Sequence, residues 1–146
     1  MSGGFYWGSR SLRRLGQCHD LLQLLFARVI RRDDLPFDLT ILCGHRGRAA
    51  QDAAYSSGAS KLRWPRSKHN KWPSLAVDVS PWLDTDDDGD TEASWDWDDY
   101  HAFAPLVKSE WAKMAAEGLV PTGVTLSWGG DWRSFKDGPH WELRGI

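Results

Sequence analysis

Two short stretches decide the fold of this chain: LAVDV at residues 75–79 and HWEL at residues 140–143. Each is largely apolar, and each carries an ionisable side chain, Asp78 in the first and His140 at the start of the second. Short apolar runs of this kind are typical of buried strands. An ionised carboxylate within such a strand is costly unless it is paired or bound to a metal. Asp78 is therefore the first candidate for a functional residue.

The segments around these strands alternate between helical and extended patterns. Apolar residues recur every three or four positions across residues 11–30, and again from Tyr100 to Met114, where Gly118 ends the helix. Further strands are predicted at residues 37–43 and 124–128, a short helix at 47–55, a long polar loop at 56–73 and an acidic loop at 84–99. We therefore predict one α+β domain over residues 1–146, with a small, mainly antiparallel sheet flanked by helices.

Composition describes an ordinary globular chain with an uneven charge. Of the 146 residues, 41% are hydrophobic and 26% are charged, and the net charge is −2. Residues 1–75 carry 13 Lys and Arg against 5 Asp and Glu, whereas residues 76–146 carry 5 against 15. A basic half is compatible with nucleic acid or with an anionic polymer such as a cell wall. The apolar runs are too short to span a bilayer, and no signal-peptide core precedes Leu21, so neither membrane insertion nor export by its own signal is expected.

The two cysteines are expected to be buried free thiols. Cys18 lies in a predicted helix and Cys43 in a predicted strand, both among apolar neighbours. Neither belongs to a CxxC pair, so we do not expect a zinc site built on them. A disulfide between them is the less favoured alternative.

Two histidines stand out among the five in the chain. His69 lies in the polar loop within SKHN, and His140 follows the turn Asp137-Gly138-Pro139. Two imidazoles and one carboxylate such as Asp78 form a standard catalytic zinc set, with the fourth position left for water. A single histidine is more often structural than metal-binding, so the case depends on what surrounds these residues.

Six short motifs surround these residues in a fixed order. They are GHR at 44–46 followed by Gln51, GASKL at 58–62, SKH at 67–69, AVD at 76–78, WGGDW at 128–132 and DGPHWEL at 137–143. In this order the chain resembles the zinc D-alanyl-D-alanine carboxypeptidases and L-alanyl-D-glutamate endopeptidases, a family that includes phage endolysins. The resemblance covers nearly the whole chain and implies a hedgehog/DD-peptidase-like fold.

The resemblance also implies a role for each site residue. His69, Asp78 and His140 would bind zinc, Asp137 would be the catalytic acid/base, and Arg46 would bind a carboxylate or carbonyl of the substrate. The family usually places its acid seven residues after the first histidine, with a glycine between them. Here the interval is nine, and Ser74 stands at the glycine position. Two added residues in a loop cost little free energy of loop closure, so the assignment is kept.

Two neighbouring features have weaker interpretations. Residues 84–90 (DTDDDGD) match the first half of a calcium loop, but position twelve is Trp95 rather than Glu. A solvated acidic loop is therefore favoured over a calcium site. Glu142 is expected on the opposite strand face from His140, in a structural or supporting role.

The leading functional hypothesis is a monomeric phage-type endolysin that cuts the L-alanyl-D-glutamate bond of peptidoglycan stem peptides. It would be made in the host bacterial cytoplasm and would reach the wall after the membrane is breached. The alternatives are a D-alanyl-D-alanine carboxypeptidase and a non-catalytic zinc module that only binds wall peptides. Nucleic-acid binding rests only on the basic half and is not expected.

Overall fold

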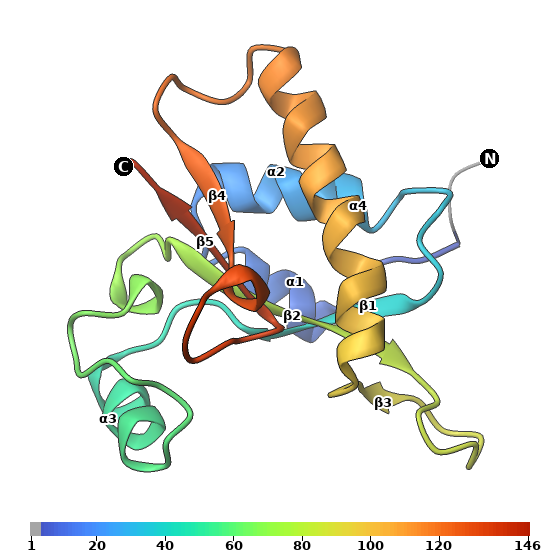
Figure 1. The fold of residues 1–146 in the computed structure, drawn as a ribbon, viewed down its shortest axis with the longest axis horizontal. Coiled ribbons are helices and arrows are strands. Elements are labelled where there is room, and N and C mark those ends of the chain that lie inside the picture. Colours follow the sequence, from blue (N-terminus) through green and yellow to red (C-terminus); the bar gives the residue numbers. More distant parts are fainter. Residues whose placement is uncertain (1–3) are drawn as a thin grey trace.

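The computed structural model describes residues 4–146, in which four α-helices flank a five-stranded sheet (Figure 1). The helices are α1 (Ser9–Leu15), α2 (Asp20–Val29), α3 (Arg48–Ser56) and α4 (Trp97–Ala116), with short 3-10 turns η1 (Lys68–Asn70) and η2 (Gly129–Asp131). The strands are β1 (Asp38–Cys43), β2 (Ala76–Leu83), β3 (Glu92–Ala93), β4 (Thr125–Trp128) and β5 (His140–Arg144). The predicted α+β class is confirmed. Residues 1–3, which belong to the predicted domain and its polar N-terminus, lie outside the described part.

The sheet is antiparallel in each of its strand pairs. Its order is β1-β2-β5-β4, and β3 pairs with the far end of β2. The two strands that decide the fold are therefore central neighbours. Their register sets Asp78 opposite His140 and Val77 opposite Trp141.

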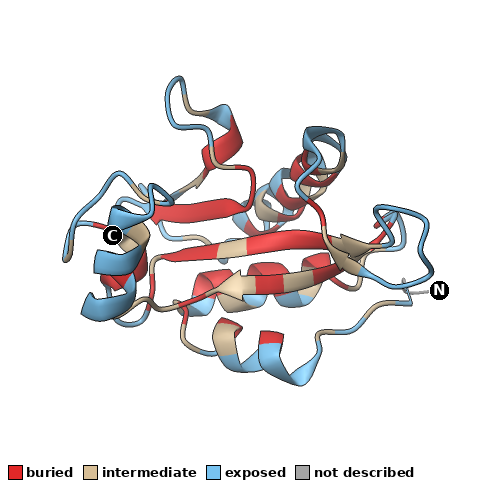
Figure 2. Ribbon diagram, turned by 90° about the horizontal axis from the view of Figure 1, so that it is seen from below, coloured by how far each residue is buried: buried red, intermediate tan, exposed pale blue. Residues whose placement is uncertain are grey.

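The period of two along β2 and β5 divides their side chains between the two faces of the sheet. Val77, Val79, Trp141 and Leu143 are fully buried and belong to the hydrophobic core. Asp78 alternates with the two valines and so lies on the opposite face. Figure 2 shows the buried residues running along these strands and the inner sides of the helices, with exposed loops at the periphery. One face of the sheet thus forms the core, and the other is free to carry chemistry.

Aromatic side chains fill the core behind this central pair of strands. Phe26 of α2 and Phe103 of α4 contact the Trp141 ring edge-on, with ring centroids 6.5 and 6.4 Å away, and Trp128 stacks on it at 5.7 Å. Buried aromatic contacts of this kind contribute strongly to packing energy. They fix the backbone of β5 directly beside His140.

The single helix predicted over residues 11–30 is wrong, because the chain breaks between α1 and α2. The His19 side chain caps α2 by accepting a hydrogen bond from Leu21 N at 3.1 Å. The backbone groups at the break pair with Ser74 instead of continuing the helix. His19 N donates to Ser74 O, and Ser74 N donates to Gln17 O, both at 2.9 Å. The break therefore ties the N-terminal segment to the loop that precedes β2.

The acidic loop is also shorter than the predicted 84–99. Strand β2 continues to Leu83, β3 pairs with its end, and α4 already begins at Trp97. Asp96 caps that helix, since its side chain accepts a hydrogen bond from Asp98 N at 3.0 Å. Within residues 4–146, none of the helices combines the length and the apolar character needed to cross a bilayer.

Candidate active site

Asp78 lies between the two histidines that the sequence singled out. Its Oδ1 atom is 3.2 Å from Nε2 of His69 and 3.3 Å from Nδ1 of His140. The two imidazole rings lie edge to face, with centroids 5.1 Å apart. The structure thus brings together three residues from η1, β2 and β5, and each directs a potential ligand atom to the same place.

The far nitrogen of each imidazole has a partner of its own. Nδ1 of His69 lies 2.7 Å from the carbonyl oxygen of Gly44, to which it can only donate. Nε2 of His140 lies 2.8 Å from Oε1 of Glu142. Each ring therefore keeps a proton on its far nitrogen, and the nitrogen that faces Asp78 donates to the carboxylate while it is protonated and can bind a metal once that proton is lost. Such outer partners are typical of metal-binding histidines.

The expected position of Glu142 was wrong. Residues two apart on a strand share a face, so Glu142 lies on the same side of β5 as His140. Arg144 holds the second oxygen of Glu142, with Nε at 3.0 Å from Oε2. Glu142 is thus braced between a cation and the imidazole that it orients.

Charge within the cluster shifts the pKa values in opposite directions. Burial by itself lowers the pKa of His69, but the charge and hydrogen bond of Asp78 raise it to about 10. Burial by itself raises the pKa of Asp78, but His69 and His140 hold it well below its usual range. The cluster therefore retains protons on its nitrogens around one carboxylate, and a divalent cation can displace such protons on binding.

The loop between His69 and Asp78 is anchored at both ends despite its added length. Ser67 caps η1 and accepts a hydrogen bond from His69 N at 3.2 Å. Ser74, fully buried, donates to the carbonyl of Ala76 at 2.6 Å and lies 3.3 Å from that of Gly44. A serine at the family's glycine position thus contributes hydrogen bonds that a glycine lacks.

Asp137 lies at the edge of the same cluster. Its Oδ2 is 4.0 Å from Nδ1 of His140. Burial, and next the negative charge of Asp78, raise the pKa of Asp137 to about 6. A carboxyl group with a raised pKa beside a possible metal site is suited to take up and release a proton near neutrality. Asp131, the other acid in this region, instead forms an exposed ion pair with Lys108 at 2.7 Å.

Arg46 also reaches the cluster. Its Nη2 lies 3.6 Å from Oδ2 of Asp78, and its Nη1 donates to Oε1 of Gln51 at 3.0 Å. The guanidinium lines the same pocket as Asp137 and the two histidines. Its position is compatible with the expected substrate contact.

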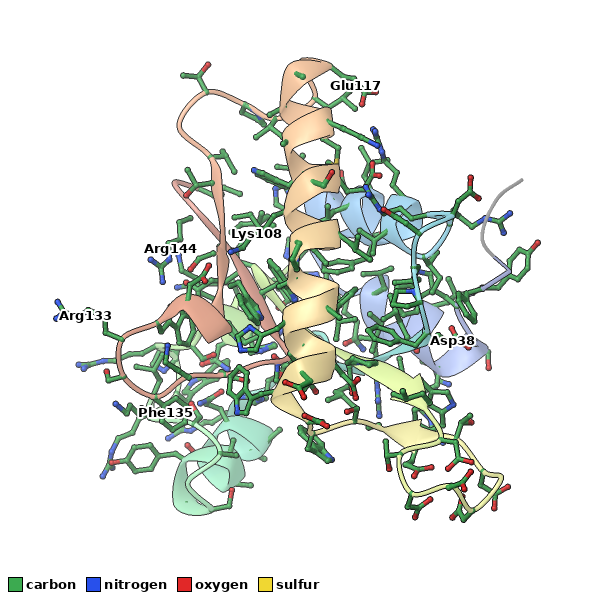
Figure 3. The ribbon with its side chains drawn as sticks, turned by 45° about the vertical axis from the view of Figure 1, so that its right-hand side comes forward. Asp38, Lys108, Glu117, Arg133, Phe135 and Arg144 are labelled. Atoms are coloured by element: carbon green, nitrogen blue, oxygen red, sulfur yellow. The ribbon has the colours of Figure 1, made fainter. Side chains whose placement is uncertain are left out.

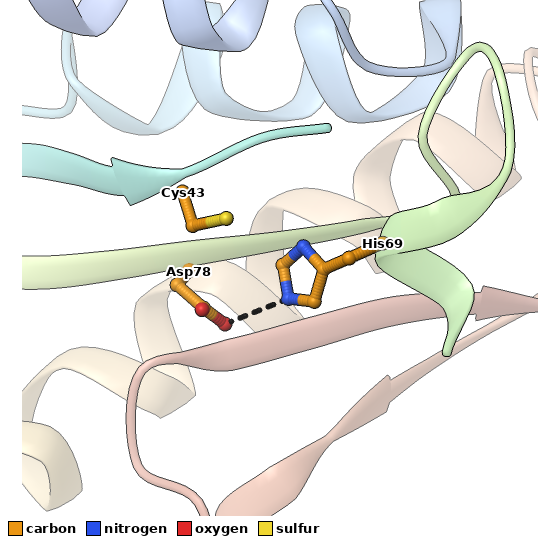
Figure 4. Close-up of side chains that lie close together, drawn as sticks. All are labelled: Cys43, His69 and Asp78. Carbon is orange, nitrogen blue, oxygen red and sulfur yellow. Dashed lines mark hydrogen bonds and ion pairs between the residues drawn. The ribbon is translucent and has the colours of Figure 1, made fainter. Parts of the chain in front are cut away.

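Sequence reasoning missed Cys43 as a neighbour of the site. Figure 4 shows Cys43, His69 and Asp78 converging from β1, η1 and β2. Their potential ligand atoms lie within 4.8 Å of one another. Burial raises the pKa of the Cys43 thiol, but the adjacent His69 outweighs this effect, and the pKa lies below its ordinary value. Both thiols are free, as predicted, and Cys18 is buried, but Cys43 is only half-buried.

A β-bulge explains why the sequence did not reveal this neighbour. Ile41 pairs with Val79, so a regular ladder would set Cys43 opposite Val77. The register shifts between Ile41 and Cys43, and Cys43 faces Asp78 instead.

The cluster forms the floor of a pocket of about 410 Å³. One wall comes from the predicted long loop, through residues 59–62, and another from Trp132, Ser134 and Phe135, between η2 and β5. Trp132 lies 5.0 Å from the His140 ring, and Lys61 lies over the Phe135 ring at 5.2 Å. Figure 3 shows Phe135, which belongs to this second wall, across the molecule from Asp38. Its volume lies within the range of about 300–1,000 Å³ that is usual for ligand-binding pockets.

The fold and pocket are those of a small α+β peptidase. The family described as phage L-alanyl-D-glutamate peptidase matches residues 3–144, and the chain belongs to this family. The crystal structure of the Serratia marcescens L-Ala D-Glu endopeptidase ChiX is similar, with a TM-score of 0.70 and 27% sequence identity. That match covers 94% of this chain and 90% of the other. The resemblance inferred from the six motifs is confirmed.

Gly129 sets the position of Asp137. A Cβ at residue 129 would collide with the carbonyl oxygen of Asp137 and lie 2.9 Å from its Cβ. Gly129→Ala should therefore displace Asp137 and lower peptidase activity by about 10²-fold, the scale expected for a misplacement of about 1 Å. Initial rates on a synthetic stem peptide measure the effect. Gly8→Ala, where a Cβ meets nothing within 4 Å, is the matched control. Wild-type activity in Gly129→Ala would contradict this prediction.

The acidic loop brings together three aspartates of the partial calcium-loop motif, at its positions one, three and five, and one glutamate. Carboxylate oxygens of Asp84, Asp86, Asp88 and Glu92 lie within 4.8 Å of one another. Glu92 occupies position nine of the loop, beyond the 84–90 match. Asp84 also accepts backbone hydrogen bonds from Asp88 N at 3.2 Å and Gly89 N at 2.8 Å. Exposed acidic groups of this kind occur with and without calcium, so calcium binding stays a prediction.

If this loop binds calcium, millimolar calcium should raise the melting temperature by mass action. The combined change of Asp84, Asp86 and Asp88 to Asn should abolish the increase, because it removes the charges without changing size. Differential scanning calorimetry measures the shift, and magnesium at the same ionic strength is the control. An unchanged melting temperature of the wild type in calcium would return the loop to a solvated role.

Proposed function

We propose that this chain is a zinc-dependent endopeptidase that cleaves the L-alanyl-D-glutamate bond of peptidoglycan stem peptides. The observation that carries the proposal is the convergence of His69, His140 and Asp78 on one point of a pocket, in a chain of the L-alanyl-D-glutamate peptidase family. We place it as a monomeric phage-type endolysin that acts in host cell lysis.

The donor set fits zinc. Two imidazole nitrogens and one carboxylate are a common catalytic arrangement that keeps a position open. Gly44 and Glu142 orient the two rings for this role. We leave Cys43 out of the set, because a fourth protein ligand would close the open position. When bound, zinc would supply Lewis-acid activation of water and of the scissile carbonyl.

Side chains of the protein itself carry out proton transfer and substrate binding. Asp137 accepts the proton of the attacking water and passes it to the amine that leaves as the peptide bond breaks. Its raised pKa matches this double role. Arg46 contacts a carboxylate or carbonyl of the stem peptide through its planar guanidinium. Trp132 packs against the ring of His140, with ring centroids 5.0 Å apart, and lines that side of the pocket.

The alternatives differ in what they require of the same pocket. A D-alanyl-D-alanine carboxypeptidase would use the same residues at the floor of the pocket to cleave a different peptide bond. The family assignment favours the L-alanyl-D-glutamate bond. A module that only binds wall peptides would not need a half-buried acid such as Asp137 at the edge of the cluster. We propose no role in nucleic-acid binding or membrane insertion. The enzyme would act from the host cytoplasm once the membrane is breached.

Digestion of purified peptidoglycan tests the scissile bond. Zinc-loaded protein should release fragments with a new D-glutamate amino terminus, which mass spectrometry after amine labelling detects. The chelated protein should release none, and zinc should restore the activity. Release of free D-alanine instead would assign the chain to the carboxypeptidase reaction.

Asp137→Asn separates catalysis from metal binding. The variant keeps the size of the side chain and removes its base, so activity should fall by about 10²–10⁴-fold. Elemental analysis should still find about one zinc per chain, because Asp137 is not one of the proposed ligands. His140→Ala, which removes a ligand, should lose zinc.

Cys43→Ser is the matched control for the ligand set. It should keep both zinc and activity if the thiol is only a neighbour. Loss of zinc in Asp137→Asn or in Cys43→Ser would make that residue a ligand. Near-normal activity of a zinc-loaded Asp137→Asn would transfer the acid/base role to another group.

A further inference from the structure

Gln51 is a buried polar residue on an otherwise solvated helix. It is the only residue of α3 that is buried, and its side chain is inaccessible to solvent. Burial of an unpaired amide is costly, so its hydrogen bonds show what the position requires.

All four hydrogen-bonding positions of the Gln51 amide are used. Oε1 accepts from Arg46 Nη1 at 3.0 Å and from Asn70 Nδ2 at 3.1 Å. Nε2 donates to the Leu62 carbonyl at 2.6 Å and to Ser60 Oγ at 3.0 Å. A guanidinium can only donate and a carbonyl can only accept, so the orientation of the amide is unambiguous.

These four bonds join three parts of the pocket. Arg46 follows β1 and faces Asp78, Ser60 and Leu62 line one wall, and Asn70 directly follows His69. Asn70 Nδ2 also donates to the Arg46 carbonyl at 3.0 Å. A single amide thus sets the distances between the guanidinium, the wall and the turn that carries His69.

Without Gln51, the Arg46 guanidinium would have another acceptor in reach. Its Nη2 is already 3.6 Å from Asp78 Oδ2. Loss of the neutral acceptor on Nη1 would let the cation close on this carboxylate, since opposite charges attract strongly in a partly buried site. The guanidinium would then be turned away from the open pocket.

We propose that Gln51 is a positioning residue for substrate binding, which acts by holding Arg46 away from Asp78 and toward the stem peptide. The proposal rests on the proposed endopeptidase function. It predicts that a change at Gln51 acts through Arg46 and so weakens substrate binding more than it slows the bound reaction.

A double-mutant cycle tests this inference. Gln51→Met keeps the length of the side chain and removes all four hydrogen bonds. It should raise KM about tenfold or more, the scale of a lost hydrogen bond to a charged group, with a smaller change in kcat. In an Arg46→Met background the same change should cost less than about twofold, because the group that Gln51 orients is gone. Kinetics on a synthetic stem peptide measure all four proteins.

Controls separate this inference from a general loss of structure. Arg28→Met removes a guanidinium of α2 whose Nε donates to Glu110 Oε2 at 2.9 Å, outside the pocket, and should leave KM unchanged. Zinc content and melting temperature are measured for every variant. If Gln51→Met does not fold, Gln51→Asn replaces it, because it keeps an amide that is too short to reach all its partners.

Two results overturn the inference. One is an equal loss from Gln51→Met with and without Arg46, which would show that Gln51 acts through something other than the guanidinium. The other is an unchanged KM in a folded, zinc-loaded Gln51 variant. A wild-type protein that cleaves no stem peptide would instead contradict the proposed function.

Discussion

The alternation of side chains along β2 and β5 is the constraint on which the rest of the structure depends. Val77, Val79 and Trp141 enter the core, and this fixes Asp78 and His140 on the opposite face. A register shift of one residue would exchange the two sets. The core packing that stabilises the domain therefore also positions the site. Asp78 is held in place by the strand itself and requires no other element to position it.

Much of this arrangement could be predicted from the sequence, because it follows from local patterns. The apolar strands, the helix ending at Gly118 and the six ordered motifs were enough for the fold class and the family. The structure also brings His69, Asp78, His140, Asp137 and Arg46 around one pocket. Their chemical roles follow from the resemblance and stay predictions.

The rest depends on contacts between distant segments, which no local pattern encodes. The bulge that turns Cys43 toward Asp78 is a property of strand pairing. The break between α1 and α2 is stabilised by the backbone of Ser74, more than fifty residues away. Glu142 is a different case. The strand period alone places it on the same face as His140, and only the contact between the two side chains had to be learned from the structure.

The backbone pairing of residues 17–19 with Ser74, an isolated β-bridge centred on Cys18, has a consequence for engineering this protein. Helix α1 does not line the pocket. The segment that follows it, however, holds the loop leading to Asp78 through backbone hydrogen bonds. Truncation or rigid fusion at this end would transmit strain to the floor of the pocket. A binding module joined to the chain there should be attached through a flexible linker, so that the anchor at residues 17–19 is left undisturbed.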